Sequence, residues 1–161
     1  MTRRGDAKLV YKMIVGPSYP SYGYWIEHGM TTLCESFLEF DETALPNLVR
    51  VDGVGNLTSL NHHFWGGVSA WLYENIAGLK IVSDRSALIQ PKLISALQHA
   101  SARYGNGDAE IFVEWERTPD GVVLKVRAIG FSYALNLARG ITVSKVSDTS
   151  RETVYFIGNA K

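Results

Sequence analysis

The chain has 161 residues, of which 46% are hydrophobic and 20% charged, and its 16 lysines and arginines balance 16 aspartates and glutamates. This composition is ordinary for one globular domain, or two small ones, with a sizeable core. Because the formal net charge is zero, no global field favours nucleic acid, an anionic membrane or a polyanionic substrate, whereas a neutral partner such as a glycan fits.

A single cysteine, Cys34, excludes an intramolecular disulfide framework, and no apolar signal-like segment follows the first residues. We therefore expect a cytoplasmic protein. No run approaches the roughly 18 apolar residues of a membrane-spanning helix, so no membrane partner is expected.

The first predicted element is an amphipathic helix over residues 4 to 15, which Gly16-Pro17-Ser18 ends. Its apolar residues recur at helical spacing: Ala7, Val10, Tyr11 and Ile14. Residues 22 to 28 can form about two further helical turns, and Gly29 follows as a residue that permits the left-handed conformation at a helix end.

The middle of the chain combines a loop with the strongest helix. Residues 41 to 56 contain Pro46 and two glycines without sustained periodicity, which predicts a long loop. An apolar stripe predicts a helix over residues 66 to 78, ended by Gly78. After Ile81 the period changes from 3.6 towards 2, so we predict a boundary near Val82 between domains 1–81 and 82–161.

The second half of the chain alternates like strands. Strands at 111–116 and 122–128 are joined through Thr118-Pro119-Asp120-Gly121, which predicts a β-hairpin. Further strands are expected at 87–90, 94–103, 132–137, 141–146 and 153–157. The meander indicates an antiparallel β-sandwich with Trp115 in its core, and hence an α+β chain with a helical N-terminal half.

Aromatic rings, glycines, a carboxylate and imidazoles are concentrated in residues 19 to 67. A sugar-processing cleft uses this mixture, because aromatic faces cover sugar C–H surfaces while polar groups bond hydroxyls. Four motifs occur here and just beyond: Tyr22-Gly23-Tyr24, Gly29-Met30-Thr31-Thr32-Leu33-Cys34-Glu35, Ser59-Leu60-Asn61-His62 and Ala77-Gly78-Leu79. In order and separation they resemble the C-terminal part of glycoside hydrolase family 78, the α-L-rhamnosidases. The resemblance covers roughly residues 5 to 130, and it departs from the family at Trp25, Met30, Cys34 and Phe37.

The resemblance implies that the helical half is an incomplete (α/α)-barrel segment and that the sandwich is of the jelly-roll type. It also implies that Glu35 is the general base of an inverting glycosidase, which needs one carboxylate to activate water and a second carboxyl group as acid. His62 matches a histidine that contacts the sugar, since imidazole can both donate and accept. Without the resemblance, Glu35 reads as a solvated glutamate and His62 as a helix-entry histidine bonded to backbone. No cofactor is implied.

The remaining aromatic and imidazole residues have weaker assignments. Trp25 and Trp65 can stack on a sugar or pack in a core, while the helical spacing of Trp71 favours the core. His63 is expected to point away from His62. A metal site at His28, His62 and His63 is disfavoured, because no cysteine or carboxylate spacing completes a zinc pattern.

The general acid has no candidate in a recognised motif, although several carboxylates lie near Glu35: Glu27, Glu39, Asp41, Glu42 and Asp52. In the resembling family the acid lies upstream. We therefore expect the C-terminal portion of an α-L-rhamnosidase-like enzyme that releases terminal rhamnose from glycosides, inactive alone. Its expected partners are a rhamnose-containing glycoside and a second copy or the remainder of the parent enzyme. The alternative is a non-catalytic, truncated remnant that binds a glycan or a protein.

Overall fold

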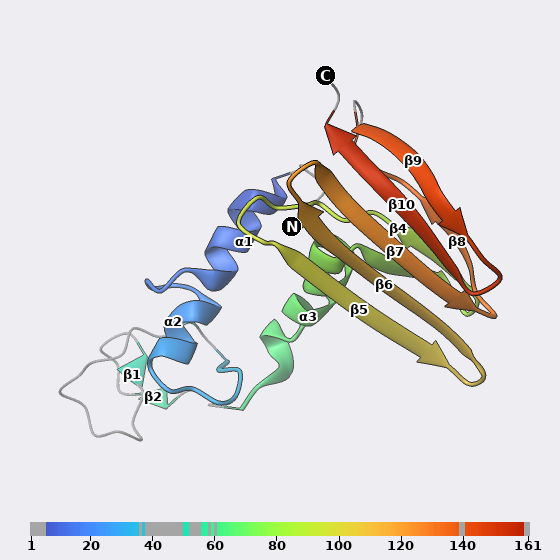
Figure 1. Ribbon diagram of the computed structural model, residues 1–161. Helices are drawn as coiled ribbons and strands as arrows, with labels where there is room; N and C mark the ends of the chain where they lie inside the picture. The colour runs from blue at the N-terminus through green and yellow to red at the C-terminus, as the bar shows by residue number, and fades with distance from the viewer. Residues whose placement is uncertain are drawn as a thin grey trace. The chain divides into compact units, whose positions relative to one another are not determined.

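The computed structural model describes residues 6–35, 37, 50–51, 56–57, 59, 61–138 and 141–159. Packing divides the chain into two compact units, Met1–Val68 and Ser69–Lys161. The first holds short helices and the second holds two β-sheets (Figure 1). This division, between Val68 and Ser69, is not the boundary predicted near Val82 between domains 1–81 and 82–161. That domain boundary stays a prediction.

The first unit begins with helix α1, Ala7–Val15. The carboxylate of Asp6 accepts from Leu9 N at 2.9 Å, which caps the helix at the position where its first N–H groups lack partners. The helix predicted over 4–15 is therefore confirmed from residue 7, while its first two predicted residues lie outside the described part of the chain.

Helix α2, Tyr22–Glu27, confirms the second predicted helix, and Gly29 follows it with φ +74° as expected. The hydroxyl of Ser21 caps α2 by accepting from Tyr24 N at 2.9 Å, and it donates to the carbonyl of Gly16. At Gly23 an added Cβ would lie 2.6 Å from the carbonyl oxygen of Val15. The glycine in the Tyr22-Gly23-Tyr24 motif thus lets α2 pack directly on the end of α1.

The rest of the first unit is irregular. Strands β1, Arg50–Val51, and β2, Asn56–Leu57, form an antiparallel pair, so the predicted loop over 41–56 contains short strands at its described positions. A 3₁₀ turn, η2, covers His63–Trp65. A small core gathers Tyr24, Trp25 and Cys34, with partly buried neighbours Tyr22, Met30, Leu33, Phe37 and Trp65.

The helix predicted over 66–78 is confirmed in position but changes type along its length. Helix α3, Gly67–Trp71, continues into the π-helix η3, Leu72–Ala77. The Asn75 amide donates to the carbonyl of Trp71 at 3.1 Å, which inserts a side chain into the ladder that an α-helix would form. Gly78 ends the helix with φ +86°, and a Cβ there would lie 2.3 Å from Pro91 N.

Five strands form the larger, fully antiparallel sheet in the order β5-β6-β7-β10-β9. Their bounds are β5 His99–Asn106, β6 Ala109–Thr118, β7 Gly121–Ile129, β9 Ile141–Asp148 and β10 Glu152–Asn159. The predicted hairpin is confirmed, with Thr118 paired to Gly121 across the turn. The strand predicted from 94 begins only at His99, after a turn in which Leu97 N donates to the carbonyl of Ile94 and the Arg117 side chain donates to the carbonyl of Leu97.

The smaller sheet has the order β3-β4-β8, with β3 Leu79–Ser83, β4 Ser86–Ile89 and β8 Ser132–Leu135. Strands β4 and β8 run parallel, so the expectation of a purely antiparallel arrangement is wrong for this pair. Parallel neighbours need a long crossover, and here the strands β5 to β7 of the other sheet provide it.

Both sheets contribute to one core. The alternating residues of β6 and β7 that point inward are fully or almost fully buried: Ile111, Val113, Trp115, Val122, Leu124 and Val126. Leu79 and Ile89 join them from the smaller sheet. Trp115 is in the core as predicted, and its indole N–H donates to the carbonyl of Ile76 at 2.8 Å. Trp71 is only half-buried, so its assignment to the core is wrong in part.

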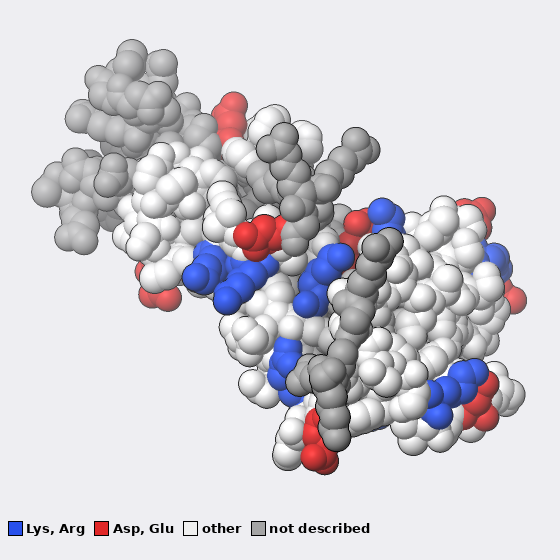
Figure 2. Space-filling model, turned by 90° about the horizontal axis from the view of Figure 1, so that it is seen from above, with Lys and Arg blue, Asp and Glu red and all other residues white. Residues whose placement is uncertain are grey.

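None of the helices that the structure describes has the length and apolar character of a membrane span. On the face seen in Figure 2, basic and acidic side chains form small groups separated by uncharged surface. That distribution agrees with the zero net charge of the chain.

Candidate functional site

The candidate site is built where two motifs of the first unit meet. The main chain of Glu35 donates from its N–H to the carbonyl of Ser59 at 2.9 Å, and His62 N donates to the carbonyl of Leu33 at 2.7 Å. These bonds join segments that are more than 20 residues apart in sequence. The Thr-Thr-Leu-Cys-Glu and Ser-Leu-Asn-His motifs are therefore one local structure.

Glu35 is held at three atoms of its own residue. Besides the N–H bond, its carbonyl accepts from the indole Nε1 of Trp65 at 3.0 Å, and its carboxylate Oε2 accepts from Ser59 N at 3.2 Å. The side chain is nevertheless exposed. A fixed backbone with a carboxylate at the surface is an arrangement that can take a proton from water.

His62 is half-buried at the entrance to η2, where its Nδ1 accepts from Phe64 N at 3.2 Å. A neutral imidazole that accepts at Nδ1 carries its hydrogen on Nε2, which then serves as a donor. The expected bond to backbone is thus present. The rings of His62 and His63 stack with centroids 5.0 Å apart, so the expectation that His63 points away is wrong.

Trp25 is a core residue, with only 2% of its surface exposed. The Phe37 ring stacks over it at 4.3 Å, and Tyr22 meets its edge at 5.4 Å. Stacking on a sugar needs an open ring face, and Phe37 covers one face of Trp25. Of the two alternatives for Trp25, the structure favours packing.

Two residues with structural roles were not assigned from the sequence. Ser59 supplies the N–H that meets the Glu35 carboxylate, and Tyr22 donates its hydroxyl to the carbonyl of Trp65 at 2.9 Å. Burial raises the pKa of Tyr22, which keeps the hydroxyl protonated as a donor. Trp65, considered for sugar stacking, is half-buried and uses its N–H on Glu35. Both Ser59 and Tyr22 lie in the motifs described above, and this was the sequence signal that could have identified them.

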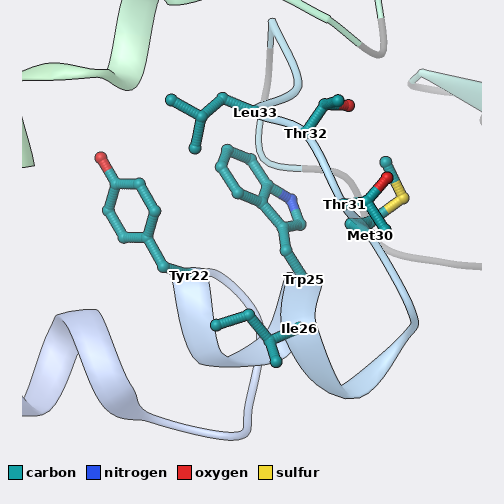
Figure 3. Close-up of a pocket in the computed structure, with 7 residues that line it drawn as sticks. All are labelled: Tyr22, Trp25, Ile26, Met30, Thr31, Thr32 and Leu33. Atoms are coloured by element: carbon teal, nitrogen blue, oxygen red, sulfur yellow. The ribbon is translucent and has the colours of Figure 1, made fainter.

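The pocket nearest these motifs has a volume of about 210 Å³. The residues that line it are all uncharged: Tyr22, Trp25, Ile26, Met30, Thr31, Thr32 and Leu33 (Figure 3).

Burial raises the pKa of the Cys34 thiol, so this lone cysteine stays in its neutral form.

Of the other carboxylates considered near Glu35, the structure describes only one. Glu27 is exposed at the end of α2, while Glu39, Asp41, Glu42 and Asp52 lie outside the described residues. Within the described part of the chain, no group of three or more histidine, cysteine and carboxylate side chains is arranged to hold a metal ion.

Comparison with known proteins gives a consistent set of matches. Residues 1–76 match the family described as bacterial α-L-rhamnosidase 6 hairpin glycosidase domain. An α-L-rhamnosidase of Alteromonas sp. (strain LOR) is 32% identical over 124 residues, covering 76% of this chain and 13% of that protein. An α-L-rhamnosidase of Formosa agariphila is 30% identical over 129 residues, covering 76% of this chain and 13% of that protein.

A solved structure shows the same fold. The α-L-rhamnosidase from Dictyoglumus thermophilum matches with a TM-score of 0.69 over 97% of this chain, at 22% sequence identity. The match covers 18% of that structure. The chain thus spans only about an eighth of the length of the curated relatives it matches.

Proposed function

Because this chain is related to the C-terminal part of the α-L-rhamnosidases of glycoside hydrolase family 78, we propose that it is the C-terminal portion of an inverting enzyme that releases terminal rhamnose from glycosides. In this proposal residues 1–81 are the end of an (α/α)-barrel and residues 82–161 are a jelly-roll-like β-sandwich. The match to the Dictyoglumus fold over 97% of the chain supports this architecture.

The observation that carries the proposal is the way Glu35 is held. In an inverting glycosidase the base takes a proton from a water molecule as that water attacks the sugar from the face opposite the leaving group. Glu35 has its N–H, carbonyl and one carboxylate oxygen engaged by Ser59 and Trp65 while its side chain stays exposed. A carboxylate so positioned can orient the water without moving during the step.

His62 is proposed to contact the sugar. Its Nδ1 is occupied by Phe64 N, so Nε2 carries the hydrogen and can donate to a sugar hydroxyl. Trp25, the third predicted site residue, is proposed to act through packing: with Tyr22 and Phe37 it supports the segment that carries Glu35.

The acid that protonates the departing oxygen is proposed to come from the part of the parent enzyme outside this chain. In inverting glycosidases the two carboxyl groups stand roughly 6.5 to 9.5 Å apart, which leaves room for the water. A base on this segment and an acid on another barrel segment meet that requirement only in the assembled domain. This chain alone is therefore expected to be inactive.

The test is Glu35→Gln in the complete enzyme, assayed on an aryl rhamnoside. Loss of a positioned base typically lowers the rate by about 10² to 10⁴, and circular dichroism should show an unchanged fold. Glu27→Gln is the matched control, because Glu27 is an exposed glutamate of the same unit. Near-normal turnover of Glu35→Gln would refute the assignment.

The second candidate is a non-catalytic remnant that binds a glycan or a protein, in which the helical unit no longer has a barrel to complete. The bond from Phe64 N to His62 Nδ1, which gives His62 a structural role that needs no sugar, favours it. The mass of the natural polypeptide separates the candidates. A mass near that of 161 residues supports the remnant, whereas a mass several-fold larger supports the enzyme.

A further inference from the structure

The segment that carries Glu35 is irregular. Residues 30 to 35 form neither helix nor strand, so their position depends on hydrogen bonds to other parts of the first unit. The main chain of Ser59 makes two such bonds to Glu35, and the indole Nε1 of Trp65 donates to the Glu35 carbonyl at 3.0 Å. How precisely the Glu35 carboxylate is aimed therefore depends in part on how firmly Trp65 is held.

Trp65 is in turn held from helix α2. It is the last residue of η2, a 3₁₀ turn of three residues, in which hydrogen-bond geometry is poorer than in an α-helix. Its carbonyl accepts from the hydroxyl of Tyr22 at 2.9 Å, across 43 residues of sequence. Two hydrogen bonds thus connect Tyr22 to Glu35 through a single residue, Trp65.

Packing fixes the ring of Tyr22. The rings of Trp25 and Phe37 meet it edge-on, with centroids at 5.4 and 5.5 Å, and Phe37 also lies 4.9 Å from the ring of Trp65. In Figure 3 the Tyr22 hydroxyl points away from α2. Because burial raises the pKa of Tyr22, the hydroxyl keeps its hydrogen and stays a donor. A donor fixed in this way can hold the main chain of Trp65 in place.

We propose that Tyr22 is a positioning residue for the hydrolysis, acting on the proposed base Glu35 through Trp65. The hydroxyl of Tyr22 holds the Trp65 carbonyl, which keeps the indole N–H on the Glu35 carbonyl and the carboxylate aimed at the attacking water. Small errors in the placement of a reacting group can lower the rate strongly. This proposal rests on the proposed function of Glu35, and it extends the support of the base to helix α2.

The first test is Tyr22→Phe in the complete enzyme, a change that removes the hydroxyl and keeps the ring. On an aryl rhamnoside kcat should fall roughly 2- to 10-fold, the range for one lost hydrogen bond, while KM changes less than about twofold. Tyr19→Phe is the matched control, because its hydroxyl donates to another carbonyl of the same unit, that of Phe37, at 3.4 Å. This control should leave kcat unchanged.

A double-mutant cycle tests whether Tyr22 acts through Trp65. In a single relay, Tyr22→Phe combined with Trp65→Phe should lower kcat no further than Trp65→Phe alone. Independent residues would instead give the product of the two separate losses, and that result would overturn the relay.

A measurement without turnover separates this proposal from the catalytic assignment. In the 161-residue chain, Tyr22→Phe should shift the ¹H–¹⁵N indole resonance of Trp65 and speed its exchange with D₂O at least about twofold, whereas Tyr19→Phe should not. An unchanged Trp65 indole would refute the relay even where Glu35→Gln abolishes activity. Near-normal turnover of Glu35→Gln, with the indole shifted, would refute the base and leave the relay as a structural contact.

Three kinetic outcomes would also overturn the proposal. A lower Tm with unchanged kcat would make the Tyr22 hydroxyl merely structural. A rise in KM alone would make Tyr22 a sugar contact in the pocket that it lines. An equal loss of kcat in Tyr19→Phe would show that removal of any such hydroxyl from this unit disturbs the site.

Discussion

The buried tryptophans of this chain differ in whether their indole N–H groups are hydrogen-bonded. Trp115 in the β-rich unit is fully buried, and its indole N–H donates to the carbonyl of Ile76. Trp25 in the helical unit is almost as buried, yet its N–H has no partner among the described residues. The indole N–H of Trp71 in the second unit is likewise buried without a partner among the described residues, so the contrast separates the centre of the large core, where the N–H is paired, from two tryptophans outside that core.

The two units also differ in the size of their described cores. The core of the β-rich unit gathers buried residues from two sheets and η3, whereas the described core of the helical unit has three buried residues. Ile26, Leu9 and Met13 are each more than half exposed on its helices, and Val82 and Val146 are exposed to a similar degree on the strands of the β-rich unit. The proposed base Glu35 therefore lies in the unit that has the smaller described core.

The largest expected effect is Trp115→Ala, which should destabilise the β-rich unit by about 3–5 kcal/mol, since it removes a large fully buried ring. The paired test is Trp→Phe at both positions, followed by denaturant unfolding and hydrogen exchange. Trp115→Phe leaves the Ile76 carbonyl without its donor and should cost about 1–3 kcal/mol. Trp25→Phe in the isolated chain should cost much less, and equal losses would break the comparison.

A second pair compares glycines with positive φ in the two units. Gly78→Ala forces a Cβ to within 2.3 Å of Pro91 N at φ +86°. The left-handed conformation costs about 1–2 kcal/mol and the steric overlap about 1–3 kcal/mol more. Gly29→Ala has φ +74° but no atom within 4 Å of the added Cβ, so only the conformational part applies. Thermal unfolding of the two variants measures the difference, and a larger effect at Gly29 would contradict it.

Local patterns predicted the elements whose partners are near in sequence. The helix around 66–78, its end at Gly78 and the hairpin through Pro119 follow from periodicity and turn residues, and the structure confirms them. The π-helix after Trp71 was not predicted, because it depends on a side chain entering the helix ladder. The parallel pairing of β4 with β8 joins strands over 40 residues apart, which alternation alone cannot specify.

The residues of the candidate site could be predicted from the sequence, but the hydrogen bonds between them could not. The motifs contain Glu35, His62, Ser59 and Tyr22, but the bond from Trp65 to the Glu35 carbonyl joins positions that neither spacing nor residue type connects. Trp25 was left open between sugar and core, since an aromatic residue in a short helix is compatible with both. Its burial and the position of the Phe37 ring over it decide for the core.

The bond between Trp65 and Glu35 predicts a moderate effect on function. Trp65→Phe removes the donor to the Glu35 carbonyl and should weaken the positioning of the proposed base by about 0.5–1.5 kcal/mol, or roughly 2- to 10-fold in kcat of the complete enzyme. KM should change less, because a positioning residue does not touch the sugar. Phe64→Leu is the control at a neighbouring residue that is 68% exposed. A rise in KM alone, or an equal loss in the control, would contradict the positioning role.

The smallest expected effect is a pH dependence confined to the β-rich unit. Glu114 on β6 bonds His99 on β5 at 3.1 Å and Lys125 on β7 at 3.3 Å. The hydrogen bond from His99, followed by the interaction with Lys125, holds the pKa of Glu114 below its ordinary range. A carboxyl group whose pKa is lowered by folding stabilises the folded state above its unfolded pKa of about 4.3, and this contribution is lost as the pH falls through the lower folded value.

Glu114→Gln should therefore reduce the stability of the β-rich unit at pH 6 by less than about 1 kcal/mol, as expected for a partly exposed cross-strand ion pair. The difference from wild type should shrink below about pH 4.3, where the ionised form of the wild-type side chain declines, and it should also shrink in high salt, because screening weakens the pair. Denaturant unfolding at several pH values measures it, with Glu116→Gln on the same strand as the exposed control. A difference that grows on acidification would reverse the sign, while one that appears in hydrogen exchange of α1 or α2 would mean that the two units unfold together, contrary to the comparison drawn from Trp25 and Trp115.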